Sequence, residues 1–183
     1  MPALRPTPTD SAVLDALPDA ARLWLFPLDQ TLDADKADAL KRRVADWLPS
    51  WVSHGRPVAA SAAVVEGRVL AVGAVISEAD LNAGVSGCGI DAMERAVAAA
   101  LDAEGVALAP ALGVTFLDGA GDGDGGWASV SRPAFRRLGR SGEAGPETVI
   151  LDVTPQTVGA LRQSGVSRPA GETWAARAFA LAG

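Results

Sequence analysis

The chain has 183 residues, of which 49% are hydrophobic and 21% charged, and its formal net charge is -6. This length suits one well-packed domain, and the apolar content lies above the disordered range. No apolar run reaches the length of a membrane span, a single cysteine allows no intrachain disulfide, and an acidic chain binds nucleic acid poorly. We therefore expect a soluble, cytoplasmic protein without nucleic-acid or membrane partners.

The first residues differ in composition from the rest of the chain. Residues 1–19 mix proline, threonine, aspartate and alanine, which predicts a flexible N-terminal extension ahead of a single domain over 20–183. Pro2, Pro6 and Pro8 interrupt the apolar residues there. We therefore expect no signal peptide.

Local patterns predict a strand, a helix and a hairpin in the next part of the chain. The aromatic run at 22–26 is typical of a strand, and a helix is expected from about Thr31, which Pro49 should end or kink. Two β runs, 56–65 and 68–76, are separated by Glu66-Gly67, a strong turn signal.

A glycine-rich stretch, 84–91, leads into a second helical pattern that Gly105 should end. Its apolar residues recur at helical spacing, so they should pack on the sheet. They are Ile90, Met93, Val97, Ala100 and Leu101. With Cys88 as the N-cap, Asp91 would occupy the third helical position, where a carboxylate favours a helix start.

The C-terminal half is predicted as a second hairpin, 112–117 with 127–131, then a helix from Ser131 to about 138. A strand at 148–153, a helix at 154–162 and a terminal helix or packed tail at 174–181 follow. The order β-α-β-β-α-β, with an extra hairpin and a C-terminal extension, predicts an α+β fold. We expect a ferredoxin-like sandwich with helices on a largely antiparallel sheet.

Cys88 is the residue with the greatest chemical potential, because a helix dipole and nearby amides would stabilise its thiolate. His54, the only histidine, and Asp91 are the candidate partners of a catalytic Cys88. The alternative is that Cys88 is a small packing residue and His54 a turn residue, since no known spacing rule links the two.

The same turn offers a second, non-covalent chemistry. The residues Ser86, Gly87, Cys88 and Gly89 would hold a phosphate or carboxylate through backbone amides at the helix start. The glycines match neither G-x-G-x-x-G nor the P-loop pattern, so we predict no nucleotide cofactor.

A loop rich in aspartate and glycine, 118–126, resembles a calcium loop at first sight. Its carboxylates, at Asp118, Asp122 and Asp124, do not follow EF-hand spacing, and the closing glutamate is missing. We interpret the loop as an acidic hairpin tip and predict no metal site.

The chain resembles a family of small bacterial proteins that carry W-x-x-H-G followed by S-G-C-S-I-D. The matching residues are 51–55 and 86–91, and the likeness runs from about 22 to 179, including an opening strand at 23–26 and a W-H-x-R-F-like ending at 174–179. Members often carry the label ABC transporter ATPase, which the missing P-loop contradicts here. The family's function is undetermined.

Three departures from the family pattern affect what the resemblance implies, and one is the absence of an acidic-basic motif at 106–109. Gly89 stands where the family has serine, and Ala175 where it has histidine. Each change removes a polar side chain, whereas the matches at His54 and Cys88 remain.

The leading hypothesis is a binding turn at Ser86 to Asp91 for a small anionic ligand or a protein partner. The alternatives are a cysteine-dependent enzyme that uses Cys88 and His54, and a purely structural or interaction module. Neither the ligand nor the partner is determined by the sequence.

Overall fold

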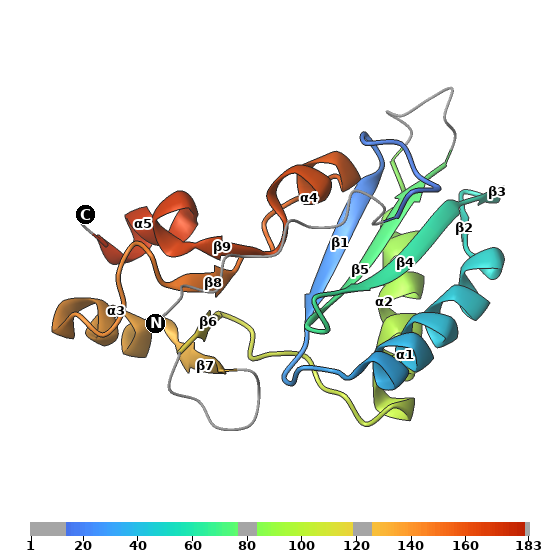
Figure 1. The fold of residues 1–183 in the computed structure, drawn as a ribbon. Coiled ribbons are helices and arrows are strands. Elements are labelled where there is room, and N and C mark those ends of the chain that lie inside the picture. Colours follow the sequence, from blue (N-terminus) through green and yellow to red (C-terminus); the bar gives the residue numbers. More distant parts are fainter. Residues whose placement is uncertain (1–13, 77–83, 119–125, 182–183) are drawn as a thin grey trace.

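The computed structural model of the chain describes residues 14–76, 84–118 and 126–181 (Figure 1). Helices lie against open antiparallel sheets, which confirms the predicted α+β class. The described strands form a three-stranded, a two-stranded and a four-stranded sheet. We call the three-stranded sheet with its helices the first lobe, and the four-stranded sheet with its helices the second lobe.

The first lobe is built on the predicted hairpin. Strands β4 (Ala59–Val65) and β5 (Val69–Val75) pair antiparallel, and β1 (Arg22–Pro27) pairs with the other edge of β5. The turn places Glu66 and Gly67 at φ 53 and 64. Every residue of β5 is buried, because its two faces are both covered.

Two helices cover one face of this sheet. Helix α1 (Ala34–Trp47) continues into a 3-10 turn, η1 (Leu48–Ser50), and α2 (Gly87–Ala103) lies beside α1. Asp33, rather than the expected Thr31, caps α1, because its side chain accepts a hydrogen bond from the backbone N–H of Lys36 at 2.8 Å. The predicted apolar face of α2 is confirmed, with Met93, Val97, Ala100 and Leu101 buried in this core and Ile90 partly buried against it.

The opposite face packs against α4 (Val158–Ser164) and against residues 14–17. Leu14 and Leu17 are buried there, so the described part of the predicted extension is packed on the sheet; residues 1–13 lie outside the description. A Cβ at Gly73 would lie 2.7 Å from Leu17 Cδ1, so any larger residue there would make the Leu17 side chain shift. Thr157 caps α4, three residues after the expected start at Thr154.

The strand that was expected to complete the ferredoxin-like sheet pairs with a different sheet. Residues 107–109 pair briefly with the end of β1, where the Ala109 N–H donates to the Pro27 carbonyl at 2.9 Å. Pro110 has no N–H with which to continue the ladder. The next strand, β6 (Gly113–Leu117), joins the second sheet instead, so the ferredoxin-like order holds only for the first three strands.

The second lobe contains the predicted second hairpin, β6 with β7 (Trp127–Ser131). Strands β8 (Val149–Leu151) and β9 (Ser167–Pro169) complete the order β7-β6-β8-β9; β9 was not predicted. Its helices are α3 (Arg132–Ser141) and α5 (Trp174–Phe179), with a 3-10 turn, η2 (Ala170–Glu172), between β9 and α5. Phe135 connects them, since its ring lies 5.3 Å from Phe116 and 5.0 Å from Phe179 between centroids.

The lobes are joined by a shared apolar cluster. Leu151 and Val166 pack with residues on the α4 face of the first sheet. Ser167 donates a hydrogen bond to the Glu66 carboxylate at the hairpin turn of the first lobe. Figure 1 shows α4 lying next to β1, between the two sheets.

Within the described residues, no helix has both the length and the apolar character needed to cross a membrane.

Candidate functional site

The start of α2 differs from the sequence prediction in its cap. Ser86, not Cys88, is the N-cap, because its extended backbone lets its hydroxyl accept from the Gly89 N–H at 3.2 Å. Cys88 is therefore the second helical residue. Asp91 lies beyond the first turn, so it does not complete a capping box.

A small hairpin, β2 (Val52–Ser53) with β3 (Arg56–Pro57), holds this helix start in place. The Ser86 N–H donates to Ser53 Oγ at 2.8 Å, and the two hydroxyls lie 3.1 Å apart. Trp51 Nε1 donates to the Gly89 carbonyl at 2.8 Å. Trp51 and Ser53 are each 1% exposed, so these residues of the W-V-S-H-G segment position the helix.

The three residues predicted for catalysis are all exposed. His54 occupies the β2–β3 turn with φ 50, followed by Gly55 at φ 73, a turn that matches the twist of a tight hairpin. Cys88 and Asp91 lie on the open side of α2. Across the described parts of the chain, no hydrogen bond or ion pair joins any two of His54, Cys88 and Asp91.

The backbone amides predicted to bind an anion are only partly available. Ser86 already satisfies the amide of Gly89. Gly87 and Cys88 are exposed, and a Cβ at Gly87 would meet nothing within 4 Å, so solvent reaches the first turn freely. The helix start is thus an open surface rather than an enclosed site.

The structure holds a second candidate, a cavity where the two lobes meet. Its volume is about 490 Å³. It is lined by the end of β1, the connection 109–112, the first residues of β6, the end of β8 and the residues after it, and the first residues of α3 and α5. The lining residues are Pro27, Ala109, Pro110, Ala111, Leu112, Gly113, Val114, Thr115, Arg132, Leu151, Val153, Thr154 and Trp174.

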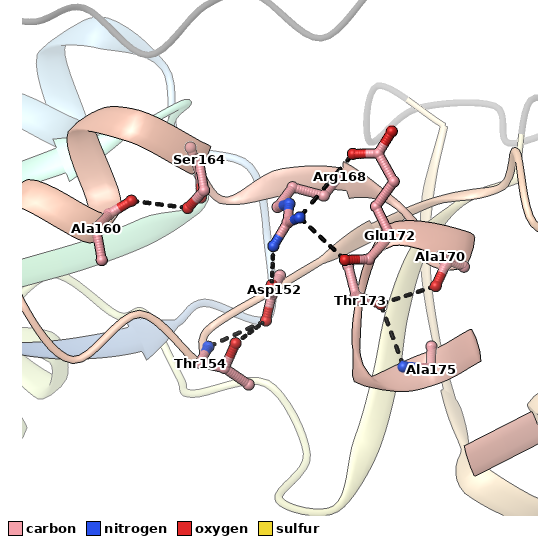
Figure 2. A network of polar contacts seen from close by, with 10 residues as sticks. Asp152, Thr154, Ala160, Ser164, Arg168, Ala170, Glu172, Thr173 and Ala175 are labelled. Atoms are coloured by element: carbon pink, nitrogen blue, oxygen red, sulfur yellow. Dashed lines mark hydrogen bonds and ion pairs between the residues drawn. The ribbon is translucent and has the colours of Figure 1, made fainter. Parts of the chain in front are cut away.

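A polar network fixes the chain after β8 at the edge of this cavity (Figure 2). The Asp152 carboxylate, 1% exposed, accepts from Arg168 Nη1 at 3.0 Å and from the Thr154 hydroxyl at 2.6 Å. Arg168 also donates to the Glu172 carbonyl at 3.0 Å. Each of these groups is satisfied within the network, so Asp152 adds no unpaired charge to the cavity.

The polar side chains on the cavity wall are few. The Arg132 guanidinium lies 5.0 Å from the centre of the Trp174 ring, a cation–π contact. The Thr115 and Ser129 hydroxyls are 2.8 Å apart. Among the described lining residues there is no aspartate, glutamate, histidine, cysteine or lysine. Nor do three such ligand side chains gather elsewhere in the described ranges as a metal would require.

Sequence reasoning did not find this cavity, because its walls come from five separate segments with no common spacing. The sequence predicts the helix that starts at Ser131, next to Arg132, and this is the part of the wall with a local signal. Nothing in the sequence indicated that Arg132 and Trp174 would meet. The aspartates Asp122 and Asp124 of the predicted acidic tip lie outside the described residues.

Comparisons with family models, with curated proteins and with solved structures gave no match for this chain. The resemblance to the W-x-x-H-G family therefore stays a prediction.

Proposed function

We propose that the chain is a binding protein for a small molecule and that the cavity between the lobes holds the ligand. Small-molecule sites are typically clefts of about 300 to 1,000 Å³, with mostly apolar walls and a few placed polar groups, and often lie between structural units. The cavity agrees in volume, in its apolar lining and in its position. The mostly apolar lining, at the point where the end of β1 and the connection 109–112 meet the second lobe, is the observation that carries the proposal.

Exposed apolar side chains at the cavity support the same proposal. Leu112 is 76% exposed and Val153 38% exposed, and both line the cavity. Leu112 also has φ 63, a left-handed conformation that costs a non-glycine residue about 1 to 2 kcal/mol. Folding alone gains nothing from this strained, solvated leucine, whereas a bound ligand would cover it.

The lining favours binding over catalysis. Nucleophilic and acid–base catalysis need a nucleophile or a base within hydrogen-bond reach of the substrate. The described walls offer two threonine hydroxyls and one arginine, and the Thr154 hydroxyl already donates to Asp152. The predicted anion- or partner-binding turn at Ser86 to Asp91 and the cysteine-dependent enzyme using Cys88 and His54 remain alternatives at a different place in the molecule.

The test uses Nile red, a neutral dye that fluoresces in apolar surroundings, and a variant that fills the cavity. We expect wild-type protein to bind the dye saturably and Val153→Trp to lose that binding. Val52→Trp is the matched control, because Val52 is an exposed valine on β2 that does not line the cavity. Equal dye binding by both variants, or no binding by wild type, would refute the proposal.

A further inference from the structure

We infer that the ligand of this cavity is an amphiphilic anion, with a carboxylate or phosphate monoester head at Arg132 and an apolar body along the remaining wall. This inference rests on the proposed function and adds the chemical class of the ligand. It begins with Arg132, the charged side chain among the described lining residues.

Arg132 is held in a geometry that leaves its donors free. The centre of its planar guanidinium lies 5.0 Å from the centre of the Trp174 ring, a cation–π contact. The N–H groups point outward from the edges of that plane, as a fork that matches two oxygens of a carboxylate or phosphate. Stacking on Trp174 also reduces the conformational freedom that binding would otherwise remove.

No protein carboxylate occupies that fork in the described chain. Arg132 forms none of the ion pairs between described residues. The nearest buried acid of the cavity edge, Asp152, is paired with Arg168 instead. Arg132 is exposed and has no counter-ion among the described residues, so its charge can attract an anion to this wall of the cavity.

The charge distribution along the chain adds to this preference. Residues 132–183 carry seven arginines and four carboxylates, whereas residues 1–131 carry nine basic and eighteen acidic residues. Arg132 also begins α3, so the positive end of that helix lies at the same wall. An amphiphile would therefore orient with its head toward α3 and its body toward the connection and β8.

The apolar wall has the residues for such a body. The aliphatic lining side chains include Leu112, Val114, Leu151 and Val153. Burying each methylene of a ligand against them would raise the affinity about fourfold before ordering costs. A simple inorganic anion would leave this surface solvated, so an amphiphile suits the cavity better.

Displacement of Nile red by three ten-carbon probes tests the inference: decanoate, decyl phosphate and decanol. Decanoate or decyl phosphate should displace the dye at a concentration about tenfold or more below that of decanol, because a charge-assisted hydrogen bond contributes at least that factor. The tighter of the two anions identifies the head group. Arg132→Gln should abolish the preference, and Arg132→Lys should retain part of it. Arg140→Gln, a control on the same helix outside the cavity lining, should keep the full preference.

The outcomes separate the two claims. If dye binding depends on the cavity but decanol competes as well as the anions, or if Arg132→Gln keeps the preference, the ligand class is wrong and the proposed function stands. If Nile red does not bind wild type, or Val153→Trp binds it normally, the proposed function itself is wrong.

Discussion

At the scale of single residues, Leu112 combines two costs, an exposed apolar side chain and a left-handed backbone. Leu112→Gly should relieve the backbone strain of about 1 to 2 kcal/mol, against a glycine entropy cost of about 0.5 to 1 kcal/mol. We expect urea unfolding to show equal or slightly higher stability, with weaker Nile red binding.

Leu108→Gly provides the comparison for that substitution. Leu108 is 48% exposed and pairs with Leu28, and its φ is not positive, so glycine there should only destabilise, by about 0.5 to 1 kcal/mol. A Leu112→Gly protein less stable than Leu108→Gly would show that Leu112 has a structural role that its exposure conceals.

Cys88 is exposed at the second position of α2. We expect one equivalent of a small alkylating reagent to modify it in the folded protein without denaturant, as mass spectrometry would record. Cys88→Ser should leave Nile red binding unchanged, because Cys88 does not line the cavity. If alkylation of Cys88 abolished dye binding, the start of α2 and the cavity would have to be coupled.

At the scale of elements, α2 is fixed by its buried face. Val97 is 2% exposed in the core beneath the helix, so Val97→Asp would bury an unpaired carboxylate and should cost at least about 3 kcal/mol. Ala99→Asp, two residues on at an exposed position, should change stability by no more than about 0.5 kcal/mol. Circular dichroism during urea unfolding measures both, and a cooperative wild-type-like transition for Val97→Asp would mean that the face is misassigned.

The network after β8 is the corresponding element of the second lobe. Asp152→Ala removes the buried acceptor of the Thr154 hydroxyl and of Arg168, whose own side chain is 26% exposed, so it should cost about 1 to 3 kcal/mol. Glu172 is the matched control, since its side chain is 66% exposed and lies 3.9 Å from Arg168. Glu172→Ala should cost no more than about 1 kcal/mol, and equal losses for the two variants would argue against a buried pair.

Elements with local signals could be predicted from the sequence. The Glu66-Gly67 hairpin follows from turn chemistry, and the buried face of α2 follows from helical spacing. The N-cap of α2 could not be predicted in this way. Ser86 is favoured over Cys88 as the cap partly because its N–H donates a hydrogen bond to Ser53, 33 residues away in the sequence. Strand β9 has three residues and ends in Pro169, too short a pattern to distinguish from a loop.

At the scale of the whole molecule, the main feature that the sequence did not predict is that the chain leaves the first sheet at Pro110 and continues in the second. Which sheet accepts the strand after 107–109 depends on long-range pairing, for which the sequence gives no period or turn signal. That diversion creates both the second lobe and the cavity beside it. The predicted site at Ser86 to Asp91 lies on a helix that does not line this cavity.

The cavity keeps its shape only if the two lobes keep their positions relative to each other. The shared cluster with Leu151 and Val166, the Ser167 hydrogen bond to Glu66 and the Arg68 guanidinium, 5.9 Å from the Trp127 ring centre, all join the two sheets. We therefore expect the proposed ligand site to be largely preformed, so that binding would need little rearrangement.

The most direct measurement is a titration of isotope-labelled protein with decanoate, followed by amide chemical shifts. Saturable shifts should concentrate at Gly113, Thr115, Arg132 and Thr154, which line the cavity, and leave the amides of Gly87 and Cys88 unmoved. Shifts confined to Gly87 and Cys88, or no saturable shifts at all, would contradict a binding site between the lobes.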